Sequence, residues 1–547
     1  MMLRSVLEDY LNCIKEREFD LPFLALLPAL GYFDIHFTHG QVEFGKDFIA
    51  KKNEDGEVVQ YSFQAKAGDI NQADWRNTIM GQMLESLLVG VGHPNFSRDL
   101  PHKSVLLTTG RLLGNVGVEI QDINKNKIVD IYKKLPIIVW DKEDILNKLM
   151  IYGVEEVFRS AGSNYESYGN FYKLYGSILR DELSLTKVEK HFQHWLDESF
   201  SLDDRILGCG LESEIIASQC IRFGRVYEAI HVYLNFLRVV LNVLDNATME
   251  QEQNRFNLIY SQLMEKLIGL MENYIYHSHY EWVKNERNLA KIIRGPGVMF
   301  TYLVFSARLM EIAGFLYFAE KETGNKNQTL SILLDFVQNE PGCGRMPSDR
   351  YAISLVLPIL ALLDGDKSDD AKKLIRKAVV WLCDRYEEGS GLASVEARTF
   401  DEVATLFGYP FDFFELATTN DSFLATVLLD LAAFLRDREF YQDVVNDVKA
   451  CKIFPVYWQI PDGKSLYFVE GTDIISYPNV HFRAESEGEL SRYEYAEHII
   501  HEPQTYNLIE IVGVVGVMGL MLLLRDRYFP KLWPLLAYLP LVATLNK

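Results

Sequence analysis

The chain has 547 residues, a formal net charge of −21 and a hydrophobic content of 48%. This length exceeds what one hydrophobic core usually supports, so several domains are expected, and the apolar content excludes a disordered chain. The negative charge argues against a protein that coats nucleic acid non-specifically, because an acidic surface repels phosphates. The six cysteines are scattered without zinc-finger spacing and are expected to be reduced core thiols.

Residues 2–15 place their apolar side chains along one helical stripe, which predicts a first helix. This stretch lacks the apolar core of a secretion signal, so a cytoplasmic protein is expected. Strand patterns follow at 32–38, 42–50, 58–67, 104–110 and 135–140, and helix patterns at about 74–90, at 116–133 and directly after Asp141. The order α-β-β-β-α-β-α-β predicts a mixed sheet with helices on both faces.

The rest of the chain has a different character, because long stretches with helical periodicity follow one another between acidic or glycine-rich turns. These stretches are 183–198, 213–246, 255–277, 299–320, 328–338, 351–363, 371–386 and 422–436. Residues 453–482 are rich in aromatic and β-branched residues and predict a small β insertion. We therefore expect a multi-domain α+β protein with an α+β domain at 1–153, an α-helical domain at 154–450, and a third part at 451–547 that contains the β insertion and an apolar helical hairpin.

The apolar tail at residues 508–545 has two interpretations. Its first apolar stretch, 511–524, is shorter than the roughly 20 residues that cross a bilayer, and its second contains Pro534 and Pro540. We expect a buried helical hairpin that closes the body, with a membrane hairpin as the alternative.

The hairpin at residues 42–66 carries polar side chains in an unusual arrangement. Asp55-Gly56 is a favoured two-residue hairpin loop, and this loop places Asp47 directly opposite Gln64. Because strand side chains alternate between faces, four polar residues share one face: Glu43, Asp47, Gln64 and Lys66. The opposite, core-facing side carries Phe44, Phe48, Val59, Tyr61, Phe63 and Ala65. The pattern predicts a hairpin that is apolar on one face only, and a solvated face of mixed charge is the plain alternative.

The polar cluster has the chemistry of a metal-dependent hydrolytic site. Magnesium prefers hard oxygen ligands and keeps several waters, so one or two carboxylates and a carbonyl suffice. Asp47, the amide oxygen of Gln64 and Glu43 could supply these ligands, and the backbone carbonyl of Ala65 is a further candidate. Lys66 beside them could orient or help to deprotonate a water and could counter the charge of a phosphate, which suits phosphodiester hydrolysis.

The segments GQVEFGKDFIA and YSFQAKAG resemble the D-(x)n-QxK form of the PD-(D/E)xK nuclease signature and are similar to Mrr-type restriction endonucleases. The element order over the first quarter of the chain resembles that restriction-endonuclease-like fold as well. The resemblance implies that Asp47 is the metal-binding aspartate, that Gln64 replaces the usual acidic residue and that Lys66 is the signature lysine. It also assigns Glu43 to an acidic position of this branch and Gln82 to a polar position on the following helix. With Gln64 in place of Asp or Glu, the site has one charge fewer at the metal.

Residues that could contact nucleic acid surround the hairpin. His36 and His39 lie near a strand end and could reach a phosphate, although a surface histidine is the plainer interpretation of each. Arg76 opens the helix after the hairpin, where it could contact backbone phosphate or remain solvated. A local basic rim, which an acidic nuclease needs, could come from Lys46, Lys51, Lys52, Lys103 and Arg111.

These patterns predict a metal-dependent endonuclease that hydrolyses DNA with Mg²⁺, for which Mn²⁺ can substitute. A nuclease domain joined to a long helical body resembles effectors of bacterial anti-phage defence, in which the second part senses a trigger or binds a protein partner. A homo-oligomer is compatible with such an effector. The alternative is a catalytically inactive nuclease-fold scaffold that binds nucleic acid or a protein partner.

Overall fold

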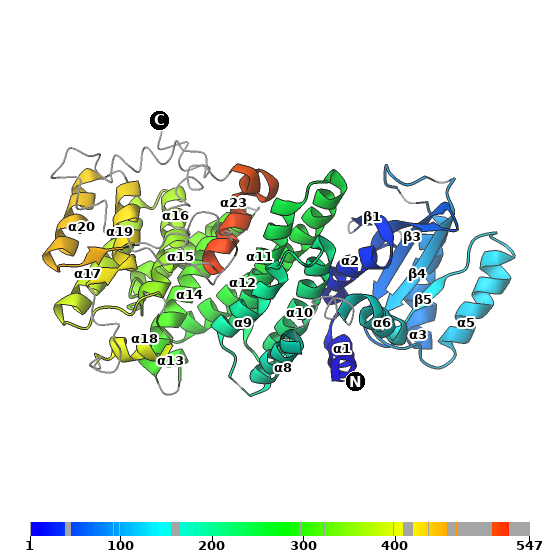
Figure 1. Ribbon diagram of the computed structural model, residues 1–547, viewed down its shortest axis with the longest axis horizontal. Helices are drawn as coiled ribbons and strands as arrows, with labels where there is room; N and C mark the ends of the chain where they lie inside the picture. Colours follow the sequence, from blue (N-terminus) through cyan, green and yellow to red (C-terminus); the bar gives the residue numbers. More distant parts are fainter. Residues whose placement is uncertain are drawn as a thin grey trace. The chain divides into compact units, whose positions relative to one another are not determined.

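The computed structural model describes residues 2–38, 45–90, 92–97, 99–154, 165–180, 182–294, 297–320, 323–395, 397, 399–408, 420–435, 437–456, 467 and 506–523. Over these residues the protein has a mixed α+β structure, in which a five-stranded sheet near the N-terminus is followed by a helical body (Figure 1). The α+β class and the helical body are thus confirmed. The chain divides into two compact units, Met1–Glu265 and Lys266–Lys547, and the boundary falls within the long helix α12 (Glu250–Lys284).

The sheet of the first unit is mixed, as the strand patterns predict. Its order is β1-β2-β3-β4-β5, with β2 antiparallel to both of its neighbours and β4 parallel to both of its own. The strands are β1 (Tyr32–Phe37), β2 (Phe48–Glu54), β3 (Glu57–Lys66), β4 (His102–Thr108) and β5 (Ile138–Trp140). β2 begins later than the predicted strand and continues to the turn, and residues 42–44 of that prediction lie outside the described residues. β3 is therefore the central strand.

An aromatic cluster covers one face of the sheet. The ring of Phe63 lies 5.2 Å from the ring of Phe23 and 5.5 Å from that of Tyr32, measured between centroids. Trp140 completes the cluster at 5.6 Å from Phe63. Phe23 belongs to α2 (Asp20–Ala29), a helix that is buried along most of its length and that the sequence patterns do not predict. A helix that is apolar on every side has no amphipathic period to detect, and α2 also contains two prolines.

Helices cover the second face as well, so the prediction of a hairpin that is apolar on one face only is wrong. Ile49 and Ser62 share the face of Asp47 and Gln64 and are fully buried. This face packs against α4 (Met80–Leu88) and α5 (Val116–Ile123), and Figure 1 shows α2 and α5 on opposite sides of the sheet. The core on this side comprises Ile70, Trp75, Ile79, Met83, Leu87, Leu106, Val116, Ile120, Ile128 and Ile137. A central strand with helices on both sides buries both of its faces.

The helical patterns of the first unit are confirmed with adjusted bounds. The remaining elements are α1 (Met2–Cys13), η1 (Glu16–Phe19), α3 (Gln72–Asp74), η2 (Trp75–Ile79), η3 (Asn124–Val129), α6 (Lys142–Lys148), η4 (Leu149–Val154), α8 (Tyr165–Leu179), α9 (Leu185–Phe192), η5 (Gln193–Leu196), α10 (Leu202–Arg222) and α11 (Val226–Asn246). The predicted stretch 213–246 is two helices, because the chain takes a positive φ of 72° at Gly224, which ends α10. Asp141 starts α6 as expected, since its side chain accepts hydrogen bonds from the first-turn amides.

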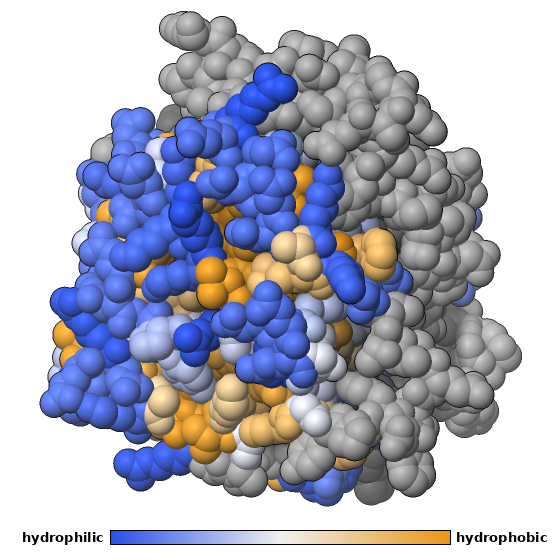
Figure 2. Space-filling model, turned by 90° about the vertical axis from the view of Figure 1, so that its left-hand side faces the viewer, coloured by the Kyte–Doolittle hydropathy of each residue, from blue (hydrophilic) through white to orange (hydrophobic). Residues whose placement is uncertain are grey.

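The second unit is mainly helical. Beyond α12 its elements are α13 (Leu289–Ile292), α14 (Val298–Ala319), α15 (Thr323–Asn339), η6 (Asp349–Leu355), α16 (Val356–Asp364), α17 (Ser368–Glu387), α18 (Thr399–Leu406), β6 (Asp421–Ser422), α19 (Phe423–Phe434), α20 (Arg438–Ala450), β7 (Phe454–Pro455) and α23 (Tyr506–Leu523). β6 and β7 form a short parallel pair. Of the predicted β insertion, only 453–456 and residue 467 are described. On the face shown in Figure 2, hydrophilic residues surround a central area of hydrophobic ones.

The apolar tail begins as a buried helix. α23 packs against α14 and η6, and residues 516–523 are buried. Residues 524–547 lie outside the described residues, so the predicted hairpin stays a prediction. Among the described helices, α14 is long and apolar enough to cross a membrane, but 61% of its most apolar stretch is buried, as in the core helix of a globular unit.

The cysteines form no disulfide, in line with the expectation of reduced thiols. All six are free. Cys209, Cys220 and Cys343 are buried, whereas Cys13 is exposed. Three of the six cysteines are therefore core thiols, as predicted, and the other three are not.

The aromatic cluster should dominate the stability of the sheet. Phe63→Ala removes a fully buried ring from the central strand and should lower the free energy of unfolding by about 3–5 kcal/mol. The matched control is Phe33→Ala, which removes an exposed ring from β1 and should cost less than about 1 kcal/mol. Urea unfolding of both variants tests this, and equal losses would contradict the assignment of the core.

Candidate functional site

The turn of the hairpin determines which residues of β2 and β3 face each other. Asp55 and Gly56 both take positive φ, 49° and 88°, as the favoured two-residue hairpin loop requires. The pairing runs from Glu54 opposite Glu57 to Phe48 opposite Phe63. One step further, the backbone amide of Asp47 donates to the carbonyl of Phe63 at 2.8 Å. The structure therefore places Asp47 next to Gln64, as the sequence predicts.

Two donors hold the carboxylate of Asp47. Its Oδ2 atom accepts one hydrogen bond from Gln64 Nε2 and a second from the backbone amide of Ala65, each at 2.7 Å. Hydrogen bonds to a carboxylate are stronger than those between neutral groups, so the carboxylate is fixed in orientation. Asp47 is half-buried at the end of the hairpin. Its carboxylate is therefore more accessible to a ligand than the side chain of a core residue would be.

Lys66 has a carboxylate partner that the sequence patterns do not predict. Its Nζ atom lies 2.7 Å from Glu16 Oε1, and Glu16 belongs to η1. The lysine side chain is 16% exposed and the glutamate 48%, so the pair lies at the protein surface. Glu16 is fifty positions away from Lys66 in the sequence and has no local motif, so only the fold brings the two together.

Gly45 lets the segment before β2 approach α4 closely. It has a φ of 67°, and a Cβ atom there would lie 2.1 Å from the backbone carbonyl oxygen of Gln82. Glycine is therefore required for both conformation and space. The side-chain oxygen Oε1 of Gln82 is buried and has no hydrogen-bond partner among the described residues. The structure thus places the backbone of Gln82 beside Gly45, and the assignment of its side chain to the site stays a prediction.

Lys46 is buried, which differs from its expected place in a basic rim. Only 3% of the residue is exposed. Burial lowers the pKa of Lys46 to about 8, although the nearby negative charge of Glu85 acts in the opposite direction. A lysine in this position cannot reach a bound phosphate without a local rearrangement.

The other expected nucleic-acid contacts are already engaged. Arg76 pairs with Glu119 of α5 through two hydrogen bonds. The other rim cations have these partners: Asp34 for Lys51, the ring of Tyr32 for Lys52, Glu54 for Lys103, and Glu8 and Glu143 for Arg111. His36 pairs with Asp34 at 2.7 Å. His39 lies outside the described residues. Lys51, Lys103, Arg76 and Arg111 are therefore paired with carboxylates, whereas Lys52 contacts an aromatic ring that leaves its charge uncancelled.

Behind Gln64, a group of hydroxyl side chains lies between the sheet and α4. Ser62 Oγ lies 2.8 Å from Ser86 Oγ and 3.1 Å from Ser104 Oγ. Nε2 of His102 is 2.9 Å from the same Ser62 hydroxyl. Burial lowers the pKa of His102 to about 4, and the positive charge of Lys46 adds to the shift.

The donor set at Asp47 suits a hard divalent cation. The described oxygen donors are the carboxylate of Asp47 and the amide oxygen of Gln64, which would have to turn toward the cation because Gln64 presents its Nε2 group to Asp47 in this structure. Glu16 adds a second carboxylate at Lys66. Glu43 lies outside the described residues. No group of three or more His, Cys, Asp or Glu side chains in the described part of the chain is arranged to hold a metal by itself. A site with only a few protein oxygen ligands suits Mg²⁺ or Mn²⁺, because waters can complete the coordination shell of these ions. Zn²⁺ instead prefers nitrogen and sulfur ligands.

Comparison of the chain with protein-family models, curated proteins and solved structures found no match. The chemistry of the site therefore follows from its residues alone. These are the fixed carboxylate of Asp47, the amide of Gln64 beside it, and Lys66, which lies two residues further along the same face of the strand.

His102, which is half-buried, should make the sheet sensitive to acid. Because the pKa of His102 is about 4 in the folded state and about 6.5 when unfolded, the unfolded chain binds the extra proton first as pH falls through 6.5. The free energy of unfolding should be nearly constant above pH 7 and should fall by about 2 kcal/mol between pH 8 and pH 5. Hydrogen exchange of the β3 amides measures the loss.

The matched variants for this measurement are His102→Asn and His277→Asn. The first removes the imidazole of His102 and should flatten the pH dependence of β3 exchange. The second removes an exposed histidine and should keep the original dependence. A flat profile in the unaltered protein would contradict the burial of a neutral His102.

Proposed function

We propose that the protein is a metal-dependent endonuclease that hydrolyses DNA phosphodiester bonds with an N-terminal domain of the restriction-endonuclease-like fold. One observation carries the proposal: the pairing of β2 with β3 holds the Asp47 carboxylate against Gln64, and Lys66 follows on the same strand face. The strand order supports it, because an antiparallel hairpin leads into the parallel strands β4 and β5.

The proposed roles follow from the contacts of each side chain. Asp47 and Gln64 would hold Mg²⁺, or Mn²⁺ in its place, with Glu43 as a further ligand. When bound, the cation would supply Lewis-acid stabilisation of the charge that develops on the phosphate. The amide of Ala65 keeps Asp47 oriented, which lowers the cost of arranging the site during the reaction. Lys66 would present a positive charge to the phosphate and help to position or deprotonate the attacking water.

Glu16 competes with the substrate in this scheme. Its carboxylate is paired with the ammonium group of Lys66, so a phosphate would have to replace Glu16 or share the lysine with it. Exposed ion pairs contribute about 0–1 kcal/mol to stability, so replacing Glu16 by a phosphate would cost little free energy. The rim cations, Arg76 among them, would similarly exchange carboxylate partners for DNA phosphates.

We further propose that the enzyme acts as an effector of bacterial anti-phage defence in the cytoplasm, with the helical body as the part that senses a trigger or binds a partner. The proposal rests on domain arrangement alone. The second candidate is an inactive scaffold of the same fold that binds nucleic acid or a protein. The ion pairs of the rim favour the protein-binding form of this candidate, because DNA binding depends on cations that are free to meet phosphates.

Cleavage of supercoiled plasmid with Mg²⁺, Mn²⁺ or EDTA tests the activity. The unaltered protein should nick or linearise the plasmid only with a divalent cation. Asp47→Ala and Lys66→Ala should each reduce the rate by about 10²-fold or more, because each removes a charge that acts at the phosphate.

The matched controls are Glu57→Ala at the hairpin tip and Lys127→Ala on η3. Both residues are exposed, and both variants should keep the original rate. Equal cleavage by Asp47→Ala and the unaltered protein would exclude this active site. Absence of cleavage with every metal, in a folded protein, would leave two functions: the scaffold, or an enzyme that stays inactive until its partner binds.

Metal binding can be tested without activity by restoring the acidic residue of the signature. Gln64→Glu replaces the donor at 2.7 Å from Asp47 with a second carboxylate, so two like charges meet when no cation is present. In EDTA the midpoint of thermal unfolding should fall by roughly 2–4 °C, as expected for about 1 kcal/mol. Mg²⁺ should restore the midpoint in this variant.

Gln121→Glu is the control for that experiment, because it adds the same charge at an exposed position of α5. It should respond to Mg²⁺ no more than the unaltered protein does. If Gln64→Glu and Gln121→Glu respond equally, Asp47 and residue 64 do not hold the cation.

A further inference from the structure

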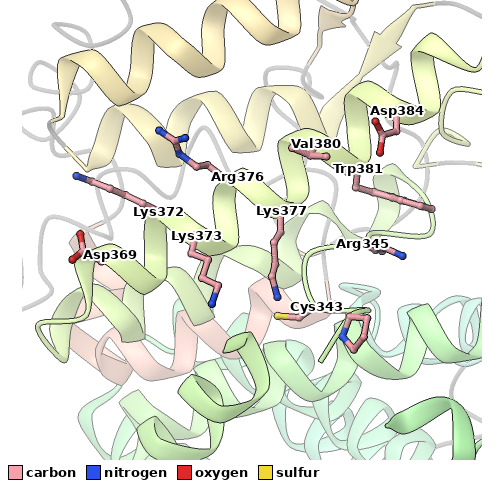
Figure 3. Close-up of a pocket in the computed structure, with 11 residues that line it drawn as sticks. Cys343, Arg345, Asp369, Lys372, Lys373, Arg376, Lys377, Val380, Trp381 and Asp384 are labelled. Atoms are coloured by element: carbon pink, nitrogen blue, oxygen red, sulfur yellow. The ribbon is translucent and has the colours of Figure 1, made fainter. Parts of the chain in front are cut away.

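The second unit contains an open cavity of about 570 Å³ on one side of α17. Figure 3 shows its lining, which comes from α17 and from the segment that follows α15. The lining residues are Pro341, Cys343, Arg345, Asp369, Lys372, Lys373, Arg376, Lys377, Val380, Trp381 and Asp384. A cavity of this size falls within the range of small-molecule sites.

Positive charge gathers in this cavity although the protein as a whole is strongly acidic. Five lining residues are Lys or Arg and two are Asp, against a net charge of −21 for the chain. Such a concentration of cations raises the local potential and attracts anions.

The cations fall into two groups. Lys372 forms an ion pair at 2.6 Å with Asp437, which caps α20, and Arg376 forms one at 3.6 Å with Asp443 of α20. The other three cations have no ion pair with a described carboxylate: Arg345, Lys373 and Lys377. Lys377 instead donates to the backbone carbonyl of Val337 at 2.7 Å. In Figure 3 the ammonium groups of Lys373 and Lys377 point to the same side of α17.

The wall opposite these lysines is held in place by buried contacts. Glu340, at the start of the segment, is fully buried and accepts hydrogen bonds from Trp282 Nε1 at 2.7 Å and from the hydroxyl of Tyr302. Gly344 has a φ of 86°, and a Cβ atom there would lie 3.1 Å from the Cβ atom of Lys377. The segment is therefore packed tightly on α17, and the cavity is preformed.

The remaining lining is apolar and aromatic. The indole of Trp381 donates to the carbonyl of Met346 at 2.8 Å, which fixes its ring, and the guanidinium of Arg345 lies 5.6 Å from the ring centroid. Val380 is 58% exposed beside it. The site thus offers cations for a charged group and an apolar surface for an organic one.

We propose that this cavity binds a small diphosphate ligand, either free or as part of an ester such as a nucleoside diphosphate. Lys373, Lys377 and Arg345 would meet the phosphate oxygens, since guanidinium and ammonium groups supply charge-assisted hydrogen bonds to phosphate. Val380 and Trp381 would contact the organic part of an ester. The site lies wholly within the second unit and does not depend on the proposed nuclease activity.

Titration calorimetry of the full-length chain in EDTA and low salt tests this proposal with three probes: inorganic pyrophosphate, ADP and adenosine. Pyrophosphate and ADP should bind and adenosine should not. Tighter binding of ADP than of pyrophosphate would identify a nucleotide-like ester as the source of the diphosphate, and equal affinity would identify the free diphosphate. Binding of adenosine as tight as that of ADP would overturn the proposal.

Two substitutions of exposed residues locate the site without disturbing the fold. Lys373→Gln and Arg345→Gln should each weaken binding of both phosphate probes by about tenfold, as expected for the loss of one charged contact. Lys291→Gln, which removes an exposed cation of α13, should leave the affinity unchanged. Unchanged affinity in the first two variants, or no binding of either phosphate probe by the unaltered protein, would overturn the site.

Discussion

The pairing of β2 with β3 is the constraint on which the candidate site depends. Asp55 and Gly56 set that pairing by taking positive φ, and eight residues away Asp47 meets Gln64 as a result. A shift of one residue would turn every side chain of β3 to the opposite face relative to β2. It would place Phe63 among the serines below α4 and Gln64 in the aromatic cluster, so both the core and the site depend on the same turn.

Local patterns predict well those features that depend on neighbours in the sequence. The hairpin register follows from one dipeptide, and the start of α6 from the capping side chain of Asp141. The placement of Asp47 opposite Gln64 needs only the register and the alternation of faces. The mixed α+β architecture follows in the same way from the order of elements, whereas the restriction-endonuclease-like identity of the domain rests on resemblance.

Features that depend on distant parts of the chain are not predictable from these patterns. α2 escapes detection because it is apolar on all sides, yet it is the helix that covers the aromatic face of the sheet. The Glu16 partner of Lys66 and the burial of Lys46 arise only when separate elements pack together. The pairing of Arg76 with Glu119 of α5 has the same origin, so the net charge of a rim cannot be deduced from its lysines and arginines alone.

The cavity of the second unit has a wall that depends on the buried contacts of Glu340, and cations that do not depend on them. The two parts therefore differ in how well they tolerate substitution. Replacing Glu340 would leave the indole of Trp282 and the hydroxyl of Tyr302 without an acceptor in the core, at a cost of about 1–3 kcal/mol for each group. Lys373 and Arg345 are exposed and hold no part of the core together. Substitution of these two cations would therefore change the charge of the cavity and leave its wall in place.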